Sequence, residues 1–583
     1  MKNRFDPLLI EVIKNEFASV NEEMAIAVYR TGRSLMVKIG DSATVLADSR
    51  GRFIGEGASV FQVGVFMSVM EKVLDKFSGT LRPGDVLLAN DPYSGMGHMP
   101  DVAVIAPVFW RGQLVAFTLT YSHHTDIGGR FAGGFTILCT ESFEEGVRIP
   151  IVKFYQAGRR DDAVADLIAA NVRNPQEWLG DVDAKIAGCR RGEQELGLLL
   201  DKYGPEVYAA TCDYLQDYAE RATRAAIRAI PPGQYSTEDF FEDDGLGTPG
   251  VALPIRIKLR AESDALTIDL TGTAPQVKGA INVPYGMTRG GIYSAVRAIV
   301  SPDVLTNDGF VRPLRIINPE GTILNPRFPG AVGGRAPLFF RLMDSMFRVL
   351  AKAMPDRVGI PGEGGDLIHF SSRSADGRNV AFMDVFCGGW GGRPTKDGID
   401  AVAPVSFGAA GTPPVELVER EHPVVIEAFG NLPDTEGAGK HRGSLSTFRK
   451  WRFLRPGTVM IRSNRLTRPS TGMAGGGPGA LSKNVFISAG RETVLPPHTH
   501  QLVEVKPGDR ILHVVSGTGG YGNPMERDPQ QVLADVVEGK ISIDRARDCY
   551  GVEIDSVELK VDNRRTTVLR SRVDANTAAE PTA

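Results

Sequence analysis

Two strand-like runs separated by a tight turn constrain this chain most, because they are expected to pair and bring polar residues together. Val102–Phe109 and Leu114–Tyr121 are rich in apolar and β-branched residues, and the WRGQ tetrapeptide between them is typical of a hairpin turn. His98 and Asp101 precede the first run, and His123-His124 follow the second. A hairpin therefore predicts that these side chains meet at one of its ends.

The side chains at this end are suitable ligands for a divalent ion. The chain has only nine histidines in 583 residues, and three of them fall within 27 positions of one another. Imidazole nitrogens with a carboxylate suit a borderline or hard ion, Zn²⁺ or Mn²⁺. The alternative is that each histidine is a hydrogen-bonded structural residue, since an H-x-x-D pair is a common pattern. Spacing alone leaves both interpretations open.

Composition narrows the class of protein. At 583 residues the chain exceeds what one core usually supports, so at least two domains are expected, and the net charge of −4 argues against a nucleic-acid or membrane-surface binder. The five cysteines are scattered without CxxC spacing, which favours a reducing cytoplasm over a disulfide framework. The N-terminus lacks the pattern of a signal peptide, and no run of 18 apolar residues predicts a membrane span.

The periodicity along the chain predicts an α+β, multi-domain fold. Residues 1–160 combine a helix that starts at Pro7 with several strands and are expected to carry the metal site. Residues 161–232 have helical periodicity, divided into three helices by Asn174-Pro175 and Gly204-Pro205, and the PPG at 231–233 is the predicted boundary. Residues 233–570 are predicted to be β-rich and glycine-rich with a few helices, and 571–583 to form a loose tail.

Nucleotide-binding motifs are not convincing in this sequence. No G-x-x-x-x-G-K-[ST] occurs, and the G-x-G-x-x-G in SGTGGYGNP (516–524) is followed at once by Asn-Pro instead of a helix. Its backbone N–H groups could cradle an anion, but the run is more typical of a structural turn. The histidine and aspartate cluster is therefore the strongest chemical constellation.

A family resemblance is carried by many ordered blocks. The string NDPYSGMGHMPDVAV, then SHHTDIGG, resembles the hydantoinase B/oxoprolinase family, as do RNPQEWLGDVDAKIA, DLTGTAPQVKGAINVP, EGAGKHRGSL and SGTGGYGNP. The likeness runs from about residue 6 to 560. Because so many blocks occur in the same order, it is more specific than any single motif.

The resemblance implies a partner and a reaction class. Chains of this family work with a separate hydantoinase A-type ATPase subunit that binds and cleaves ATP, and we expect two chains of each type in a heterotetramer. The pairs hydrolyse small cyclic amides such as hydantoins, lactams and 5-oxoproline. The family's metal ligands correspond here to His98, Asp101 and His123. Related subunits occur in acetone and acetophenone carboxylases, so a carboxylase and a non-catalytic scaffold for the ATPase remain alternatives.

One departure from the family pattern draws attention to a further carboxylate. Many members carry Lys-Glu-Arg near residue 39, and that Glu can join the metal, whereas this chain has Lys38-Ile39-Gly40-Asp41. The resemblance therefore makes Asp41 the fourth predicted ligand, a variant that looks most like the metal subunit of caprolactamases.

The expected chemistry is metal-assisted hydrolysis of an activated amide. The partner would phosphorylate the amide oxygen, and the metal would lower the pKa of a bound water that attacks the carbonyl carbon. His124 and Asp126 adjoin the ligands and are the predicted catalytic groups, as a proton shuttle or as supports of the ligands. The alternative is that His124 only packs and Asp126 only caps the DIGG turn.

Overall fold

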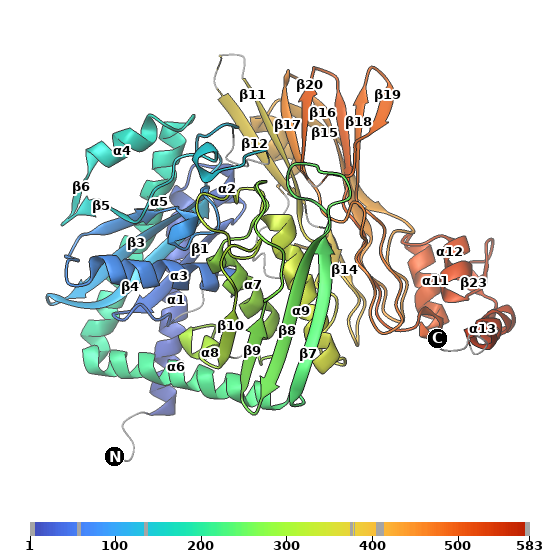
Figure 1. Ribbon diagram of the computed structural model, residues 1–583, viewed down its shortest axis with the longest axis horizontal. Coiled ribbons are helices and arrows are strands. Elements are labelled where there is room, and N and C mark those ends of the chain that lie inside the picture. Colours follow the sequence, from blue (N-terminus) through green and yellow to red (C-terminus); the bar gives the residue numbers. More distant parts are fainter. Residues whose placement is uncertain are drawn as a thin grey trace. The chain divides into compact units, whose positions relative to one another are not determined.

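The structure is a computed structural model that describes residues 6–54, 60–132, 138–302, 304–373, 377, 379–386, 388–403, 413–498 and 500–577. Its chain divides into two compact units. Unit 1 comprises 1–349, 369–383 and 406–411, and unit 2 comprises 350–368, 384–405 and 412–583. Helices and sheets occur in both units, which confirms the predicted α+β, multi-domain class (Figure 1).

The main sheet of unit 1 has six strands in the order β1-β4-β3-β2-β5-β6. Every neighbouring pair in it is antiparallel. Because strands β3 and β4 are adjacent in sequence and space, they form the hairpin that the sequence predicts. The strand bounds are β1 Ser42–Asp48, β2 Val86–Ala89, β3 Asp101–Trp110, β4 Gln113–His123, β5 Val152–Gln156 and β6 Arg159–Arg160.

The hairpin turn sets the register of the site. Arg111 and Gly112 both have positive φ, 49° and 83°, which is the backbone of a type I′ turn. The resulting ladder pairs Asp101 with His123 and Val102 with Ser122. Since side chains alternate between the two faces of a strand, Asp101 and His123 share one face and the second pair lies on the other.

Helices accompany this sheet as the sequence predicts. Asp6 caps the first helix by accepting the Leu8 N–H at 3.0 Å, and prolines begin α5 and α6 where their missing N–H groups cost nothing. Helix α5 contacts α1, β3 and β4. The helix bounds are α1 Pro7–Thr31, α2 Leu35–Lys38, α3 Val60–Phe77, α4 Asp162–Ala169, α5 Pro175–Tyr203 and α6 Pro205–Arg228, with short 3-10 turns η1 Pro92–Ser94 and η2 Ser142–Glu144.

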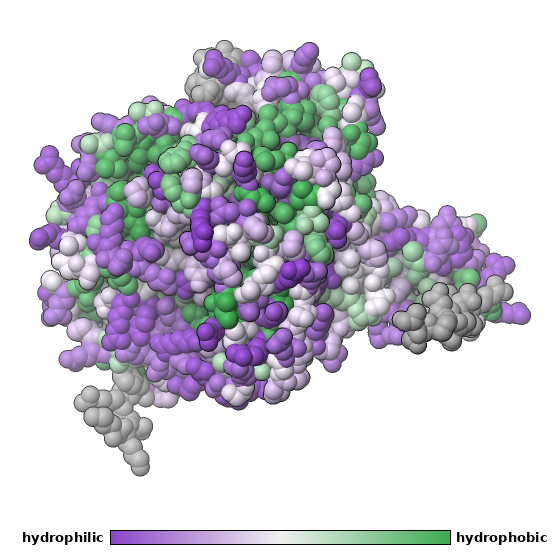
Figure 2. All heavy atoms as spheres, viewed as in Figure 1, coloured by the Kyte–Doolittle hydropathy of each residue, from purple (hydrophilic) through white to green (hydrophobic). Residues whose placement is uncertain are grey.

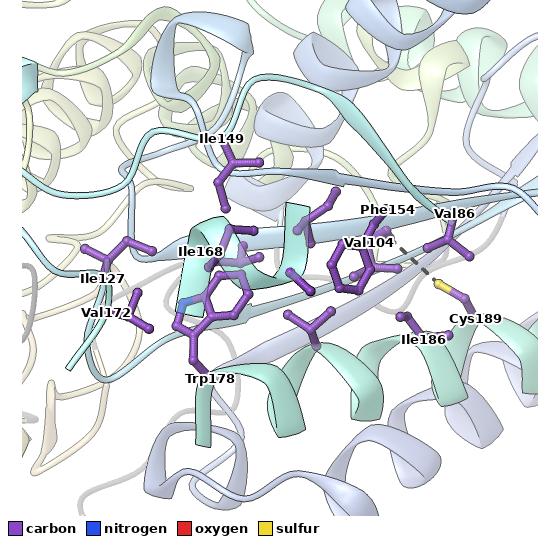
Figure 3. Packing of buried hydrophobic residues seen from close by; sticks show 14 of the residues in the cluster. Val86, Val104, Ile127, Ile149, Phe154, Ile168, Val172, Trp178, Ile186 and Cys189 are labelled. Atoms are coloured by element: carbon purple, nitrogen blue, oxygen red, sulfur yellow. Dashed lines mark hydrogen bonds between the residues drawn. The ribbon is translucent and has the colours of Figure 1, made fainter. Parts of the chain in front are cut away.

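An apolar core lies between α4, α5 and one face of the sheet. Figure 3 shows Val104 and Phe154 of the sheet packed against Trp178 and Cys189 of α5. Val102, Val104 and Ala106 of β3 belong to this core, so Asp101 and the odd-numbered residues of the strand face away from it. The core therefore fixes the sheet from behind and leaves the opposite face for the site.

A second sheet and three helices complete most of unit 1. Its order is β10-β9-β8-β7, in which β9 and β10 run parallel. The ESD turn at 262–264 joins β8 to β9 as predicted. The bounds are β7 Gly233–Phe241, β8 Leu253–Glu262, β9 Ala265–Asp269, β10 Leu314–Ile317, α7 Tyr285–Arg297, α8 Asp308–Val311 and α9 Ala336–Ala353.

Two sheets, with the orders β12-β11-β17-β20 and β15-β16-β21-β18-β19, lie mainly in unit 2. The strands are β11 Asp366–Arg373, β12 Asn379–Phe386, β15 Val424–Leu432, β16 Ser446–Phe453, β17 Gly457–Arg462, β18 Lys483–Ser488, β19 Arg491–Val494, β20 His500–Val505 and β21 Arg510–Val514. The remaining elements are β13 Gly389–Trp390, β14 Ile399–Asp400, α10 Val415–Glu421, η3 Pro524–Glu526, α11 Pro529–Val537, α12 Ile543–Tyr550, β22 Ile554–Asp555, β23 Lys560–Val561 and α13 Asn563–Thr577.

Glycine-rich segments in unit 2 pack backbone against backbone. Residues 435–443, 470–479 and 516–522 are joined by N–H···O bonds from Gly437 to Thr518, from Gly477 to Ala438 and from Gly520 to Gly477, at 2.7–2.9 Å. A Cβ on most of these glycines would meet backbone atoms of a neighbouring segment. The G-x-G-x-x-G run belongs to this layer, so it is a structural element, as its sequence context favours.

The structure agrees with some of the boundaries predicted from the sequence and differs from others. The change from helices to strands at 231–233 is confirmed, but it lies inside unit 1, so as a division into domains it stays a prediction. The first residues of the tail predicted from 571 form the end of helix α13, and 578–583 lie outside the described residues. At the start of the same helix, Asp562 accepts the Arg565 N–H at 3.0 Å. The strand expected near 556–561 is reduced to β23.

On the face shown in Figure 2, hydrophilic residues cover much of the surface and apolar residues form smaller areas between them. Among the residues that the structure describes, no helix has both the length and the apolar character that a membrane crossing requires.

Candidate metal centre

His98, Asp101 and His123 converge at the end of the hairpin. One ligand atom from each lies within 4.8 Å of the other two, and all three residues are buried. His98 reaches the other two through a short loop, in which the Asp101 N–H donates to the His98 carbonyl at 3.0 Å. The structure thus brings together three of the four predicted ligands.

The spacing of the two imidazoles fits a shared ion. The Nε2 atoms of His98 and His123 are 3.2 Å apart. Two nitrogens bound tetrahedrally to one Zn²⁺ at about 2.0–2.1 Å would be separated by about 3.3 Å. The donor set of two imidazoles and a carboxylate is also one that Zn²⁺ and Mn²⁺ accept. The residues present therefore fit a divalent ion.

Asp101 is the centre of a charged hydrogen-bond network. Its Oδ2 lies 2.7 Å from His98 Nδ1 and 3.3 Å from Nη2 of Arg335, while its Oδ1 accepts the Tyr121 hydroxyl at 2.7 Å. Although burial opposes ionisation, His98 and Arg335 hold the pKa of Asp101 well below its ordinary value. Asp101 is therefore held as a carboxylate, which is the form that binds a cation.

Asp41 adjoins the cluster but is not one of its three members. Its carbonyl accepts the His123 N–H at 3.2 Å, just before β1 pairs with β4. Burial and the negative charge of Asp101 raise the pKa of its carboxyl to about 7, while Arg335 acts in the opposite direction. A cation bound beside both carboxylates would favour their charged forms. The role of Asp41 as a ligand stays a prediction.

His124 points to the opposite face of the sheet. Its Nε2 lies 2.6 Å from the Lys185 ammonium, and its ring lies 4.8 Å from that of Trp178. Burial, together with the charges of Lys185 and His123, holds the pKa of His124 well below its ordinary value, so the ring is neutral. These contacts match the packing alternative, and a proton-shuttle role stays a prediction.

Asp126 organises the turn that follows the two histidines. Its Oδ2 accepts the N–H groups of Gly128 at 3.0 Å and Arg173 at 2.8 Å, and its Oδ1 binds the Arg173 guanidinium at 2.9 Å. Asp126 therefore caps the DIGG turn, as the structural alternative expects. A direct catalytic role stays a prediction.

Three functional candidates were missed by the sequence argument. Tyr121 contacts Asp101 because it lies two residues before His123 on the same face of β4. Arg335, which contacts Asp101, lies in the segment just before α9, far from the hairpin in sequence. The sequence did contain a sign of its role, because Arg335 is a single charged residue among glycine and apolar residues in AVGGRAPLFF. Lys185 could have been noticed because it is a charged residue among the buried residues of α5.

Known proteins resemble the chain along nearly its whole length. The sequence profile of the hydantoinase B/oxoprolinase family matches residues 6–524. A protein of Pseudomonas sp. (strain NS671), named as the B-type subunit of a D-/L-hydantoinase, is 30% identical over 97% of this chain and 98% of its own.

Two solved structures have the same fold. The ATP-dependent caprolactamase of Pseudomonas jessenii superposes with a TM-score of 0.88 at 28% identity, covering 98% of this chain and 100% of that one. A nucleotide-free acetone carboxylase superposes with a TM-score of 0.89 over 99% of this chain and 84% of that one, but its 17% identity shows the fold alone. With the family profile covering most of its length, the chain belongs to the hydantoinase B/oxoprolinase family.

Proposed function

We propose that this chain is the metal-dependent subunit of an ATP-dependent cyclic amide hydrolase. The observation that carries the proposal is the convergence of His98, Asp101 and His123 in a chain whose relatives include one component of a hydantoinase and a caprolactamase. Zn²⁺ or Mn²⁺ would be held by these three residues and Asp41. When bound, such an ion supplies a Lewis acid that activates water and polarises an oxygen of the substrate.

The reaction needs activation because an unstrained amide is a poor electrophile. We propose that a hydantoinase A-type partner transfers the terminal phosphoryl group of ATP to the amide oxygen and releases ADP. A first water then attacks the carbon of the phosphorylated amide, and the ring C–N bond breaks as the nitrogen takes up a proton, which leaves an acyl phosphate. A second water hydrolyses this acyl phosphate to the carboxylate and inorganic phosphate. This division of labour agrees with the lack of a convincing nucleotide motif here and with the name of the hydantoinase relative, which makes it one subunit of a larger enzyme.

The chain's own residues would prepare the site for negative charge. Tyr121 donates to Asp101 and so orients its carboxylate, and Arg335 places a buried guanidinium beside it. The guanidinium of Arg335 would stabilise negative charge that develops on the substrate oxygen or on the phosphate. Its electrostatic effect is strong because it is buried away from water. The structure supports these roles through position and burial.

His124 and Asp126 would support the ligands from behind. His124 is held by Lys185 and Trp178, and Asp126 by Arg173, so each fixes a backbone segment next to His123. We propose that they affect turnover by holding His123 in place, and that the assembly contains two chains of each type.

Reconstitution with a hydantoinase A-type partner tests this function. The complex should hydrolyse ATP faster with a lactam, a hydantoin or 5-oxoproline, and it should release the ring-opened acid in amounts that match ADP. The control is the same complex with acetone and bicarbonate. Carboxylation of the ketone without opening of any cyclic amide would assign the chain to the carboxylase alternative.

A further inference from the structure

Helix α5 carries a buried lysine directly behind the candidate metal centre. Lys185 has no exposed surface. Its neighbours on the helix, Ile186 and Cys189, lie in the part of α5 that packs on the sheet (Figure 3). Burying an ammonium group costs several kcal/mol unless it is well paired. Burial lowers the pKa of Lys185 to about 7. Because burial of this charge is unfavourable, packing alone does not explain why a lysine stands at this position.

All three donors of this ammonium have a partner. Its Nζ donates to the carbonyl of Val102 at 3.1 Å and to Oγ of Ser122 at 3.2 Å, and it lies 2.6 Å from Nε2 of His124. Val102 directly follows Asp101, while Ser122 and His124 flank His123. One side chain therefore fixes both strands at the positions next to two of the candidate ligands.

The contact with His124 also fixes the state of that ring. When Lys185 is protonated, its ammonium has donors and no acceptor, so Nε2 of His124 accepts the hydrogen bond. The proton of the neutral ring is then on Nδ1. Trp178 packs against the same ring with an interplanar angle of 47°, so the imidazole is held in position as well as in tautomer.

The same face of α5 holds the segment that leads to Asp41. Asp181, one turn before Lys185, accepts the N–H groups of Arg33 at 2.7 Å and Ser34 at 3.1 Å. Ser34 caps the short helix α2, which ends at Lys38. Asp181 and Lys185 at i and i+4 thus connect α5 to the segments beside three of the four candidate ligands.

We propose that Lys185 is a positioning residue of the metal centre, which acts through Val102, Ser122 and His124 to hold Asp101 and His123 at the spacing the ion requires. The inference rests on the metal site proposed above. Groups that orient metal ligands from behind typically change metal affinity about 10–100-fold when they are removed.

The test is a Zn²⁺ titration of the full-length chain against a chelating dye, for wild type, Lys185→Met and Lys185→Gln. Methionine matches the length of the side chain but removes every donor, and glutamine keeps N–H donors without the charge. The matched control is Lys202→Met, at an exposed lysine of the same helix. We expect Lys185→Met to bind Zn²⁺ about 10–100-fold more weakly, glutamine to restore much of the affinity, and Lys202→Met to behave as wild type.

Thermal unfolding of the metal-free variants separates positioning from simple stability. Lys185→Met removes a buried charge but also leaves the groups that Lys185 contacts without this donor. Because these two effects oppose each other, its melting temperature should stay close to that of wild type. Wild-type Zn²⁺ affinity in a folded Lys185→Met chain would overturn the proposal, and so would an affinity loss that accompanies an equally large loss of stability. If the methionine variant does not fold, ¹⁵N shifts of the His124 ring decide, since a proton on Nε2 contradicts donation by Lys185. Failure of the wild-type chain to bind Zn²⁺ or Mn²⁺ would instead refute the metal site itself.

Discussion

Asp101 and His123 are directly paired across the β3–β4 ladder, with Asp101 as the first residue of β3 and His123 as the last of β4. The pairing of these two residues in the ladder is therefore set by backbone hydrogen bonds and the type I′ turn at the far end of the hairpin. Because the backbone provides this geometry, removal of one ligand side chain should leave the fold intact.

Replacement of His98 or Asp101 by alanine should abolish metal binding and turnover. Each change removes one of three converging donors, while the hairpin and its core remain. Mass spectrometry measures the metal content, and the far-ultraviolet circular dichroism spectrum shows whether the fold is kept. His441→Ala, a histidine outside the cluster, is the control. Full metal content in either ligand variant would show that the site is assigned to the wrong residues.

Asp41→Asn should weaken metal affinity and strongly reduce turnover of the reconstituted complex. The amide keeps an oxygen donor but removes the negative charge, on which binding of a divalent ion beside two neutral imidazoles depends. ATP binding by the partner should not change. Wild-type metal content and turnover in this variant would leave a three-residue site of His98, Asp101 and His123.

The isolated chain should neither bind ATP tightly nor hydrolyse it. The glycine run at 516–522 is used for backbone packing, and its N–H groups bond to neighbouring segments, as Gly520 N–H does to Gly477. Isothermal calorimetry of the chain without its partner is the measurement. Tight nucleotide binding there would contradict the proposed division of labour.

Gly443→Ala should destabilise unit 2 by on the order of 3 kcal/mol, as expected for overpacking of a rigid core. A Cβ at this position would overlap the carbonyl oxygen of Thr518, which is fixed because it accepts the Gly437 N–H at 2.8 Å. Gly477→Ala is the matched control, since its Cβ would have no neighbour nearer than 3.6 Å. Equal urea midpoints for the two variants would show that the glycine layer tolerates side chains.

Asp308 should make the stability of unit 1 depend on pH. Burial and the negative charge of Asp48 raise the pKa of Asp308 to about 6, although its carboxylate accepts the Phe53 N–H at 2.7 Å. The folded chain therefore keeps a proton that an unfolded aspartate loses near pH 4. This contribution to the free energy of unfolding is complete below about pH 4 and is lost as the pH rises through 6.

Asp308→Asn keeps the acceptor oxygen but cannot ionise. Between pH 4 and 7 its free energy of unfolding should rise relative to wild type by on the order of 2 kcal/mol, since one pKa unit corresponds to about 1.4 kcal/mol. Urea unfolding at several pH values measures the difference, with exposed Asp75→Asn as the control. Parallel pH curves for Asp308→Asn and wild type would exclude this role.

The sequence contains the local parts of this fold in recognisable form. The hairpin, the cap at Asp6 and the proline-punctuated helices α4, α5 and α6 follow from short-range periodicity and turn chemistry, and the structure confirms them. The strands of unit 2 are harder to recognise because their glycine-rich connections have no side-chain period. Their packing depends on close backbone approaches between segments far apart in sequence.

The candidate site also combines residues that the sequence predicts with residues that it does not. His98, Asp101 and His123 could be grouped because one hairpin carries them. Arg335 and Lys185 reach the same region through tertiary packing of α5 and the segment before α9, which no spacing rule predicts. Strand alternation places His124 on the face opposite to His123, an inference that was not drawn when His124 was predicted to be a catalytic group.

The metal content of the purified wild-type chain tests the central claim most directly. Inductively coupled plasma mass spectrometry should find about one equivalent of zinc or manganese per chain, as expected for a single site with protein ligands. The His123→Ala chain, purified in parallel, should contain none above background. A metal-free wild-type chain that opens a cyclic amide at full rate with its ATPase partner would contradict the account.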